Sequence, residues 1–438
     1  MLLFAMLATC SCAPGEPPQR PNVVVIFLDT LRPDYLGFYG YEKEMAPFLA
    51  GLANESVVFE RAFSTSSWTA PSTSSLFTSL YPPQHGVVEG FMMHHVRTAK
   101  REQAEKETIP LNRLPSDRAL LPEKFQSMGY RTFGIATNVN IGDEIGFSRG
   151  FDRFEQIRKS SAGVVLERVE AWKEEILASK AFFLYLHLND VHLPYHAREP
   201  YYEKQEGELE DRRARYLSEL SYVDAHIRRI YETLGLDEET VFVVLSDHGE
   251  EFRDHGGLEH RARLYAELNR VLMMFHAPSM GLEPRRITAT NVSLVDVLPT
   301  LIDLVGGKPV GDEEGISLVP LLKNDDGSEE LAEALRRRIL FAHRVGGGEP
   351  QPELWAAMHR YWKLIEQPDG KRELFDHRSD PGEKRNVYHR HRDVPGARLV
   401  AALQKFKERE VRENPEVIQV EVDDELKETL KSLGYVNQ

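Results

Sequence analysis

Cysteine is almost absent from this chain of 438 residues, and the two that occur, Cys10 and Cys12, lie near the N-terminus. The rest therefore has no disulfide framework, and its compartment cannot be inferred from cysteine usage. Basic residues are also scarce: 54 Lys and Arg stand against 69 Asp and Glu, a formal net charge of −15. This balance, without a basic patch, predicts no nucleic-acid partner. Past the N-terminus no apolar run reaches the ~18 residues of a membrane-spanning helix, so we predict no transmembrane span.

The apolar start, M-L-L-F-A-M-L-A-T-C, resembles a truncated secretory signal that stops at Cys10. L-A-T-C also resembles a bacterial lipoprotein cleavage box, in which Cys10 would be the lipidated residue. We therefore expect an exported protein, either periplasmic or anchored to a membrane as a lipoprotein. Residues 1–21 would comprise this segment and a Pro-rich spacer.

Buried strand patterns alternate with helical ones from residue 22 to residue 337. The run N-V-V-V-I-F-L is typical of a parallel strand buried on both faces. The alternation predicts an α/β fold with a mostly parallel sheet. Predicted strands are Asn22–Leu28, Tyr130–Ala136, Ala181–Leu188, Thr240–Leu245 and Val271–His276; predicted helices are Met45–Ala53, Pro71–Leu80, Val164–Ala178, Asp211–Leu234 and Val292–Val305.

The pattern changes over residues 338–438, where short strand candidates are separated by turns. Asp369-Gly370 is a hairpin signal between two of them. Helical patterns at Ala397–Arg412 and Asp424–Leu433 follow. We predict a C-terminal subdomain with a small antiparallel sheet and terminal helices. Residues 89–117 lack periodicity and are interpreted as a loop near the site.

Chemistry-bearing residues follow two of the predicted strands. Asp29 comes directly after Leu28, and the run S-D-H-G-E places Asp247 and His248 after another strand. In open α/β sheets, ligands bind beyond the carboxyl ends of the strands. Carboxylate and imidazole together suit Zn²⁺ or Mn²⁺ better than Ca²⁺. The alternatives are that Asp29 only caps a turn and that the Asp-His pair lies in a surface turn.

The stretch from Trp68 to Gly86, W-T-A-P-S-T-S-S-L-F-T-S-L-Y-P-P-Q-H-G, resembles the nucleophile signature of the sulfatase family, within the alkaline phosphatase superfamily. Thr69 stands where the family has the Cys or Ser that becomes formylglycine, and Thr73 stands where it has Arg. The resemblance continues to E-L-F-D-H-R-S-D-P-G-E-K-R-N, which ends at Asn386. It implies an alkaline phosphatase-like α/β sandwich with a sulfatase-like catalytic domain at 22–337.

The resemblance also implies a metal site. Asp29, Asp247 and His248 would hold a divalent ion, Zn²⁺, Mn²⁺ or Ca²⁺, with a second ion left open. Thr69 would complete the ligand set and act as the nucleophile, since a metal-bound hydroxyl loses its proton more easily. The alternative for Thr69 is a helix N-cap in a protein without activity.

Two histidines are candidates for handling the substrate. In F-L-Y-L-H-L-N-D-V-H-L-P-Y, His192 matches the family's site histidine, whereas we interpret His187 as packing within the strand. His260 lies twelve residues after His248, as in the phosphoethanolamine transferases of the superfamily, which also use Thr. His192 and His260 would hold a second ion, bind ester oxygens or donate a proton to the leaving group. The alternative for each is a hydrogen-bonded structural histidine.

Positive charge is missing from the predicted pocket. Thr73 replaces the family's Arg, and Asn138 and Asn140 occupy the segment of its Lys-x-His motif, so Thr73 and Asn138 become candidate substrate-binding residues. We predict a sulfatase-like, metal-dependent hydrolase of sulfuric or phosphoric esters of a small molecule, glycan or lipid. A phosphoryl-group transferase or phosphodiesterase is the alternative enzyme, and a catalytically silent surface binding protein is the alternative from another class.

Overall fold

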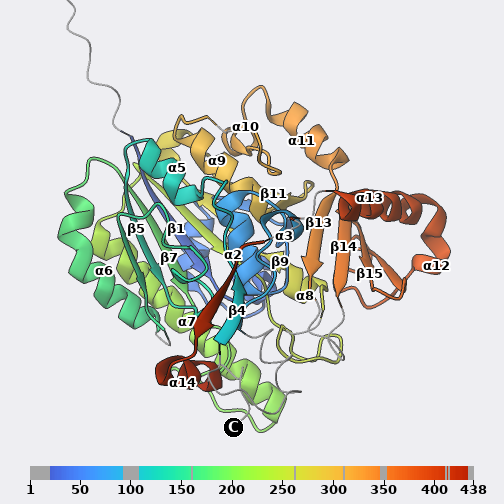
Figure 1. Cartoon of the computed structure of the whole chain (residues 1–438), viewed down its shortest axis with the longest axis horizontal. Coiled ribbons are helices and arrows are strands. Elements are labelled where there is room, and N and C mark those ends of the chain that lie inside the picture. The colour runs from blue at the N-terminus through green and yellow to red at the C-terminus, as the bar shows by residue number, and fades with distance from the viewer. Residues whose placement is uncertain are drawn as a thin grey trace, which may run out of the picture.

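The computed structural model describes residues 20–91, 108–158, 161–260, 263–308, 311–345, 353–409, 412 and 415–432. Its centre is an eight-stranded sheet with the order β11-β2-β10-β8-β1-β7-β5-β6 (Figure 1). β8, β1, β7, β5 and β6 run parallel, whereas β10 is antiparallel to both β8 and β2. The strands are β1 Asn22–Leu28, β2 Val57–Phe59, β5 Arg131–Ala136, β6 Arg153–Gln156, β7 Phe182–Leu188, β8 Thr240–Ser246, β10 Met273–His276 and β11 Arg285–Ile287. The predicted α/β class with a mixed, mostly parallel sheet is confirmed.

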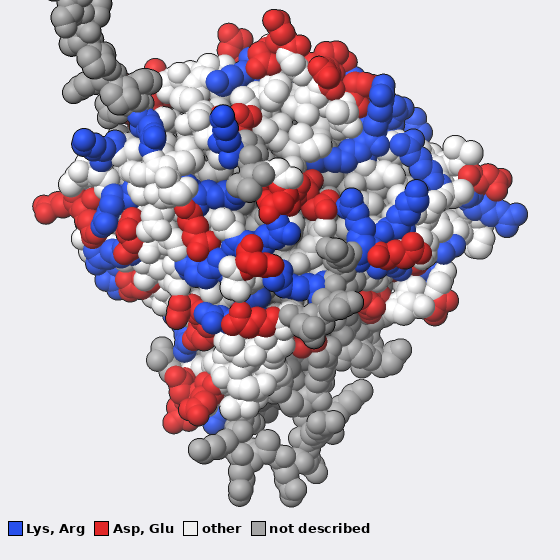
Figure 2. All heavy atoms as spheres, turned by 45° about the horizontal axis from the view of Figure 1, so that its top comes forward, with Lys and Arg blue, Asp and Glu red and all other residues white. Residues whose placement is uncertain are grey.

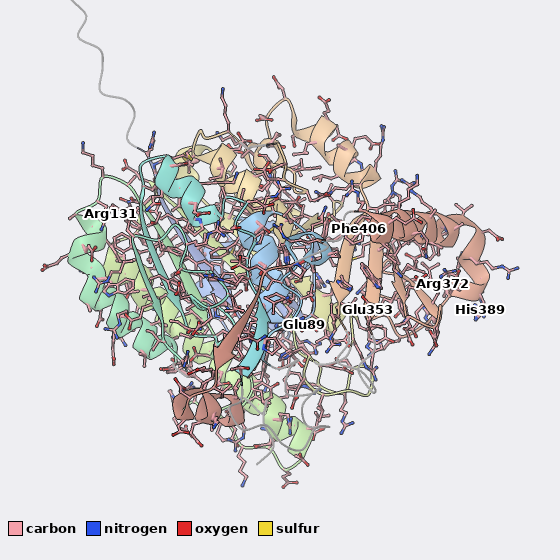
Figure 3. The ribbon with its side chains drawn as sticks, viewed as in Figure 1. Glu89, Arg131, Glu353, Arg372, His389 and Phe406 are labelled. Carbon is pink, nitrogen blue, oxygen red and sulfur yellow. The ribbon has the colours of Figure 1, made fainter. Side chains whose placement is uncertain are left out.

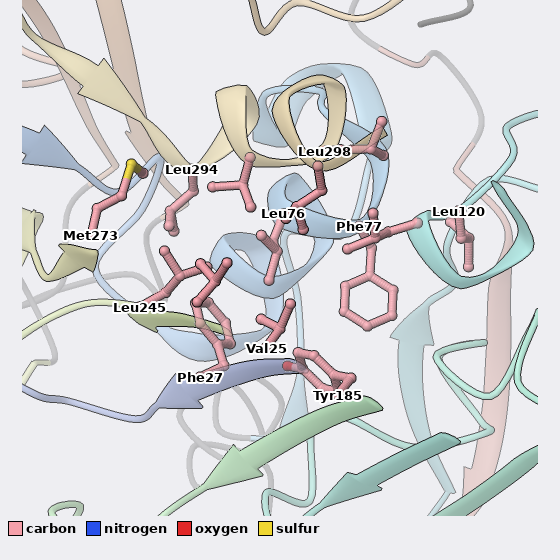
Figure 4. Packing of buried hydrophobic residues seen from close by; sticks show 14 of the residues in the cluster. Val25, Phe27, Leu76, Phe77, Leu120, Tyr185, Leu245, Met273, Leu294 and Leu298 are labelled. Atoms are coloured by element: carbon pink, nitrogen blue, oxygen red, sulfur yellow. The ribbon is translucent and has the colours of Figure 1, made fainter. Parts of the chain in front are cut away.

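Both faces of the sheet are covered, because alternate residues of its central strands enter two different cores. On β1, Val25 and Phe27 pack in one core, and Ile26 and Leu28 pack in the other. Helices α2 Thr69–Thr78, α5 Leu121–Ser127 and α9 Val297–Leu304 cover the first face, and α1 Pro47–Ala53, α6 Ala162–Leu177 and α7 Glu208–Leu234 cover the second. Figure 4 shows Leu76 and Phe77 of α2 above Val25 and Phe27. This packing fixes α2 over the middle of the sheet.

An antiparallel four-stranded sheet, β13-β14-β15-β16, lies to one side of the main sheet (Figure 1). Phe406 of helix α13 packs against its strands, as Figure 3 shows. The small predicted sheet is thereby confirmed, while the boundary at residue 338 stays a prediction. Its elements are β13 Leu340–Arg344, β14 Leu354–His359, β15 Trp362–Glu366, β16 Arg372–Asp376, α12 Tyr388–His391 and α13 Ala397–Glu408.

Shorter elements complete the fold. They are β3 Ala62–Phe63, β9 Arg270–Val271 and β12 Val292–Ser293, which form a three-stranded sheet, and α3 Pro82–His85, α8 Ala266–Asn269, α10 Val319–Lys323 and α11 Ser328–Arg337. The C-terminal strand β17 Val417–Glu421 pairs antiparallel with β4 Thr108–Asn112, and α14 Asp424–Ser432 follows it. β4 corrects the interpretation of residues 89–117 as a loop throughout. The predicted lipidation site, Cys10, lies outside the described residues.

Charged side chains on the surface are mixed by sign. On the face shown in Figure 2, the Lys and Arg of the described residues are interspersed with Asp and Glu. Within the described part of the chain, no helix combines the length and apolar character that crossing a bilayer requires.

Candidate active site

The candidate site lies at the carboxyl ends of β1, β7, β8 and β5. The register places Leu28 beside both Ser246 and Leu188, so the residues that follow these strands meet at one edge of the sheet. The backbone continues this contact: Asp29 N–H donates to Leu188 O over 2.9 Å, and Asp247 N–H donates to Leu28 O over 3.2 Å. Parallel strands thus bring together side chains that are more than 200 residues apart in sequence, at the edge where ligands bind in such sheets.

Four predicted residues converge on one point there. Thr69, the first residue of α2, places Oγ1 3.4 Å from Asp29 Oδ2 and 3.4 Å from His248 Nε2. His248 Nε2 also lies 3.6 Å from Asp29 Oδ1 and 3.3 Å from Asp247 Oδ2. Ligands bound about 2.0–2.2 Å from one ion stand about 3.4 Å apart in a tetrahedral site. The spacing of these four side chains therefore fits a shared cation.

The hydrogen bonds of Asp247 leave one carboxylate oxygen for such an ion. Asp247 Oδ1 accepts from Thr30 N–H over 3.0 Å and from His248 N–H over 2.7 Å. Oδ2 is buried and accepts no hydrogen bond from the residues that the structure describes. Buried polar atoms are normally satisfied. The orphaned Oδ2, in a ring of carboxylate, hydroxyl and imidazole donors, fits a divalent metal.

Burial sets the charge state of these groups. Burial raises the pKa of Asp247 well above its ordinary value, and the neighbouring Asp29 carboxylate raises it further. Burial also acts to raise the pKa of Asp29, but four histidines, first among them His192, lower it overall. The pKa of His248 falls to about 3 because of burial and then of His260, so its imidazole is neutral and can bind a metal. A cation bound between the buried carboxylates of Asp29 and Asp247 would stabilise both of them in the charged form.

Asn138 follows β5 and holds Asp29 and Thr69 in place. Its Nδ2 donates to Asp29 Oδ2 over 2.6 Å and lies 3.4 Å from Thr69 Oγ1. Its Oδ1 accepts from Asn140 N–H over 2.8 Å, which fixes which way the amide points. The predicted substrate-binding residue therefore contacts the nucleophile candidate and a ligand candidate directly.

Thr73 lies one turn after Thr69 on the same side of α2. Its side chain is fully buried, and its Oγ1 makes no hydrogen bond to the described residues. Thr69 also opens a helix of ten residues, whose first N–H groups favour an anion. An ester bound to Thr69 would thus lie at the start of α2, and this helix provides no arginine to contact it.

The two further histidines lie beside the four convergent residues. The ring centroid of His260 is 4.7 Å from that of His248 and 5.0 Å from that of His192. His192 Nδ1 lies 2.7 Å from Leu193 O, so it carries the proton and donates to this carbonyl. Both predicted histidines therefore lie next to His248, one of the four convergent residues, or next to its neighbour.

Glu250 also lies at the site, although nothing in the run S-D-H-G-E distinguishes it as a site residue. Its carboxylate is fully buried, which raises its pKa. Oε1 lies 3.1 Å from His260 Nδ1, and Oε2 accepts from Tyr195 O–H over 2.5 Å. A carboxylate on one ring nitrogen orients a histidine and fixes its tautomer. Glu250 therefore holds the ring of His260 in the site.

His187 was also missed as a site residue. It is buried within β7, as expected of a packing residue, but its Nε2 lies 3.7 Å from Asp29 Oδ2. Ligand atoms of Asp29, His187 and Asp247 all lie within 4.8 Å of one another. The alternation of side chains along a strand is the pattern that could have selected His187. His187 pairs with Phe27, and Asp29 follows Phe27 by two residues, so His187 and Asp29 lie on the same face of the sheet.

With this geometry in place, comparison with known proteins identifies the family. The family model described as Sulfatase matches residues 21–307. The chain belongs to the sulfatase family. It is accordingly an ester hydrolase, and the metal dependence of the family agrees with the candidate ligands of the site.

Relatives of similar length share about a fifth of their residues with this chain. An ulvan-active sulfatase of Formosa agariphila is 22% identical over 423 residues, covering 85% of this chain and 78% of the relative. A delta 4,5-hexuronate-2-O-sulfatase of Bacteroides thetaiotaomicron is 21% identical over 450 residues, covering 87% of each. The structure of a phosphonate monoester hydrolase of Agrobacterium radiobacter superposes with a TM-score of 0.68 at 18% identity, covering 89% of this chain and 94% of that one. This likeness confirms the fold.

Proposed function

We propose that this family member hydrolyses phosphoric or phosphonic esters, with Thr69 as the nucleophile in place of formylglycine. The observation that carries this proposal is the position of Thr69 Oγ1, 3.4 Å from both Asp29 Oδ2 and His248 Nε2 at the start of a helix. A hydroxyl among metal ligands is an activated nucleophile. Threonine has the oxygen needed for one ester bond, but not the hydrated aldehyde that formylglycine supplies.

Each group of the site then has a role in the reaction. Asp29, Asp247 and His248 would hold the ion, which lowers the pKa of the Thr69 hydroxyl when bound. Thr69 releases its hydroxyl proton to solvent, and Oγ1 forms a bond to phosphorus as the bond to the leaving oxygen breaks. His192 or His260, in its protonated form, donates a proton to that oxygen. Water then attacks phosphorus as the bond from phosphorus to Oγ1 breaks; the histidine takes one proton from the water, and Oγ1 regains a proton from solvent. Asn138 keeps Asp29 and Thr69 oriented throughout.

We expect faster hydrolysis of a phosphorus ester than of a sulfate ester because of the charge of the side chains around the site. Among the residues that the structure describes, the side chains that contact the four convergent residues include Asn138, His187 and His260 and no Lys or Arg. Thr73 offers a hydroxyl where the family has Arg. Losing one donor to the developing charge costs about 10²–10³ in rate. We therefore expect sulfate ester turnover to be the weaker activity.

Matched p-nitrophenyl esters test this proposal. The kcat/KM of the Mn²⁺- or Zn²⁺-loaded protein should be higher for a phosphodiester or an aryl phosphonate than for the aryl sulfate. Thr69→Ala should abolish turnover, and Thr69→Ser should retain part of it. Thr78→Ala is the matched control, because Thr78 lies in the same helix and, among the described residues, its hydroxyl bonds to backbone atoms of Ser74 and Leu80. A faster sulfate ester, or full activity in Thr69→Ala, would contradict the proposal.

The same intermediate permits the alternative reaction. If an alcohol replaces water in the second step, the protein is a phosphoryl-group transferase, and product analysis with added alcohols separates the two. A silent binding protein would show neither turnover nor a need for the ion. We also propose that the protein is exported, that Cys10 carries a lipid anchor, and that the substrate is an ester of a glycan or a lipid.

A further inference from the structure

His187 occupies a position that the assigned chemistry does not use. Along β7, alternate residues Phe183, Tyr185 and His187 point to the face of the sheet that α2 covers. His187 pairs with Phe27 of β1, and Asp29 follows Phe27 by two residues, directly after the end of β1. The buried ring of His187 therefore lies next to the Asp29 carboxylate.

The ring nitrogens of His187 are the second observation. The side chain is fully buried, and neither nitrogen has a hydrogen-bond partner among the described residues. Buried imidazoles are normally bonded through at least one nitrogen. Nε2 lies 3.7 Å from Asp29 Oδ2, which is longer than a hydrogen bond but close to the spacing of two ligands on one ion.

The residues next to His187 offer further ligand atoms for a metal ion. Asp29, His187 and Asp247 each offer one ligand atom, and these atoms lie within 4.8 Å of one another. The oxygen of Asp247 that accepts no described hydrogen bond is Oδ2. Imidazole nitrogen is a common metal ligand, so the unbonded ring nitrogens of His187 fit a place in this group.

We propose that His187 is a ligand of the metal ion, which is then held by two imidazoles, His187 and His248, together with the carboxylates of Asp29 and Asp247. The proposal rests on the metal-dependent function proposed above. Two nitrogen ligands favour Zn²⁺ or Mn²⁺, since Ca²⁺ takes oxygen ligands. The site would therefore be selective for a transition metal.

X-ray absorption of the zinc-loaded full chain tests the proposal, because scattering from imidazole rings counts the histidines on the ion. The wild type should show two, and His187→Ala and His248→Ala should each show one. His276→Ala is the matched control and should keep two, since His276 is a buried histidine of β10 whose Nδ1 bonds Glu55 O. Zinc affinity, measured against a chromophoric chelator, should fall at least about 10–100-fold in His187→Ala, because losing even an outer-shell partner costs that much.

The wild-type count is decisive even if a variant fails to fold. One imidazole in the wild type, or two in His187→Ala, would overturn the role of His187. If the wild type with one imidazole still hydrolyses the aryl ester, the proposed function stands without His187 as a ligand. Absence of both bound zinc and turnover would overturn the ligand and the proposed function together.

Discussion

Replacing Glu250 by Gln is predicted to slow the enzyme through His260. The Glu250 carboxylate accepts two buried hydrogen bonds, from His260 Nδ1–H at 3.1 Å and from Tyr195 O–H at 2.5 Å. An amide has one oxygen, so its NH₂ group must face one of these donors. The shorter bond should keep the oxygen on Tyr195, and His260 then loses its acceptor.

The size of the expected rate loss follows from the hydrogen bond that His260 loses. Hydrogen bonds to a charged group are worth about 1.5–3 kcal/mol. At about 1.36 kcal/mol per tenfold change in rate, this corresponds to a loss of roughly 10–150-fold in kcat/KM. If His260 protonates the leaving oxygen, the loss should be larger for a phenyl ester than for a p-nitrophenyl ester, because phenol is the poorer leaving group.

A neighbouring glutamate provides the comparison. Glu251 is also buried, but its Oε1 accepts from the backbone N–H groups of His255 and Gly257. Glu251→Gln should therefore slow both esters by the same factor. The reasoning is refuted if Glu250→Gln keeps kcat/KM within about threefold of the wild type, or if it slows both esters equally.

Three further predictions concern stability and the ion. Burial raises the pKa of Glu219 to about 9 from 4.5, so between these values the folded state binds a proton that the unfolded state lacks, and stability falls as the pH rises. Glu219→Gln should remove part of this loss, seen as a smaller drop in Tm from pH 5 to pH 9; an unchanged slope would count against it. Lys363→Ala should destabilise the protein by about 3–5 kcal/mol in urea unfolding, because it leaves the buried carboxylate of Glu383, 3.1 Å from Lys363 Nζ, without its cation; a change below about 1 kcal/mol would contradict this. A chelator should abolish turnover and lower Tm, and Zn²⁺ or Mn²⁺ should restore both; a protein indifferent to the chelator would contradict metal dependence.

The sequence predicted the parts of the site that local pattern determines. The buried runs before Asp29 and Asp247 indicated parallel strands, and parallel strands end at one edge of a sheet. His187 and Glu250 could not be selected this way. Their roles depend on which strand lies beside which, and on a loop that brings Glu250 under His260.

In the fold too, local pattern predicts the elements, but it does not predict where they divide or which strands pair. The sequence predicts one helix over Val292–Val305, but α9 begins only at Val297. Val292 and Ser293 pair with β3, and Asp296 Oδ2 accepts a hydrogen bond from Ser293 N–H over 2.8 Å. Likewise, Val271–His276 divides between β9 and β10, which belong to different sheets. The pairing of β17 with β4 joins segments about 300 residues apart, which no local pattern indicates.

The mass of the peptide that carries Thr69, after acid quenching during turnover of an aryl phosphonate or phosphodiester, tests the central claim most directly. The account predicts an unmodified Thr69 before substrate is added and a phosphoryl or phosphonyl adduct on Thr69 during turnover. The adduct should accumulate in His260→Ala if that histidine also assists its hydrolysis. An adduct on another residue, or undiminished kcat in Thr69→Ala, would contradict the account.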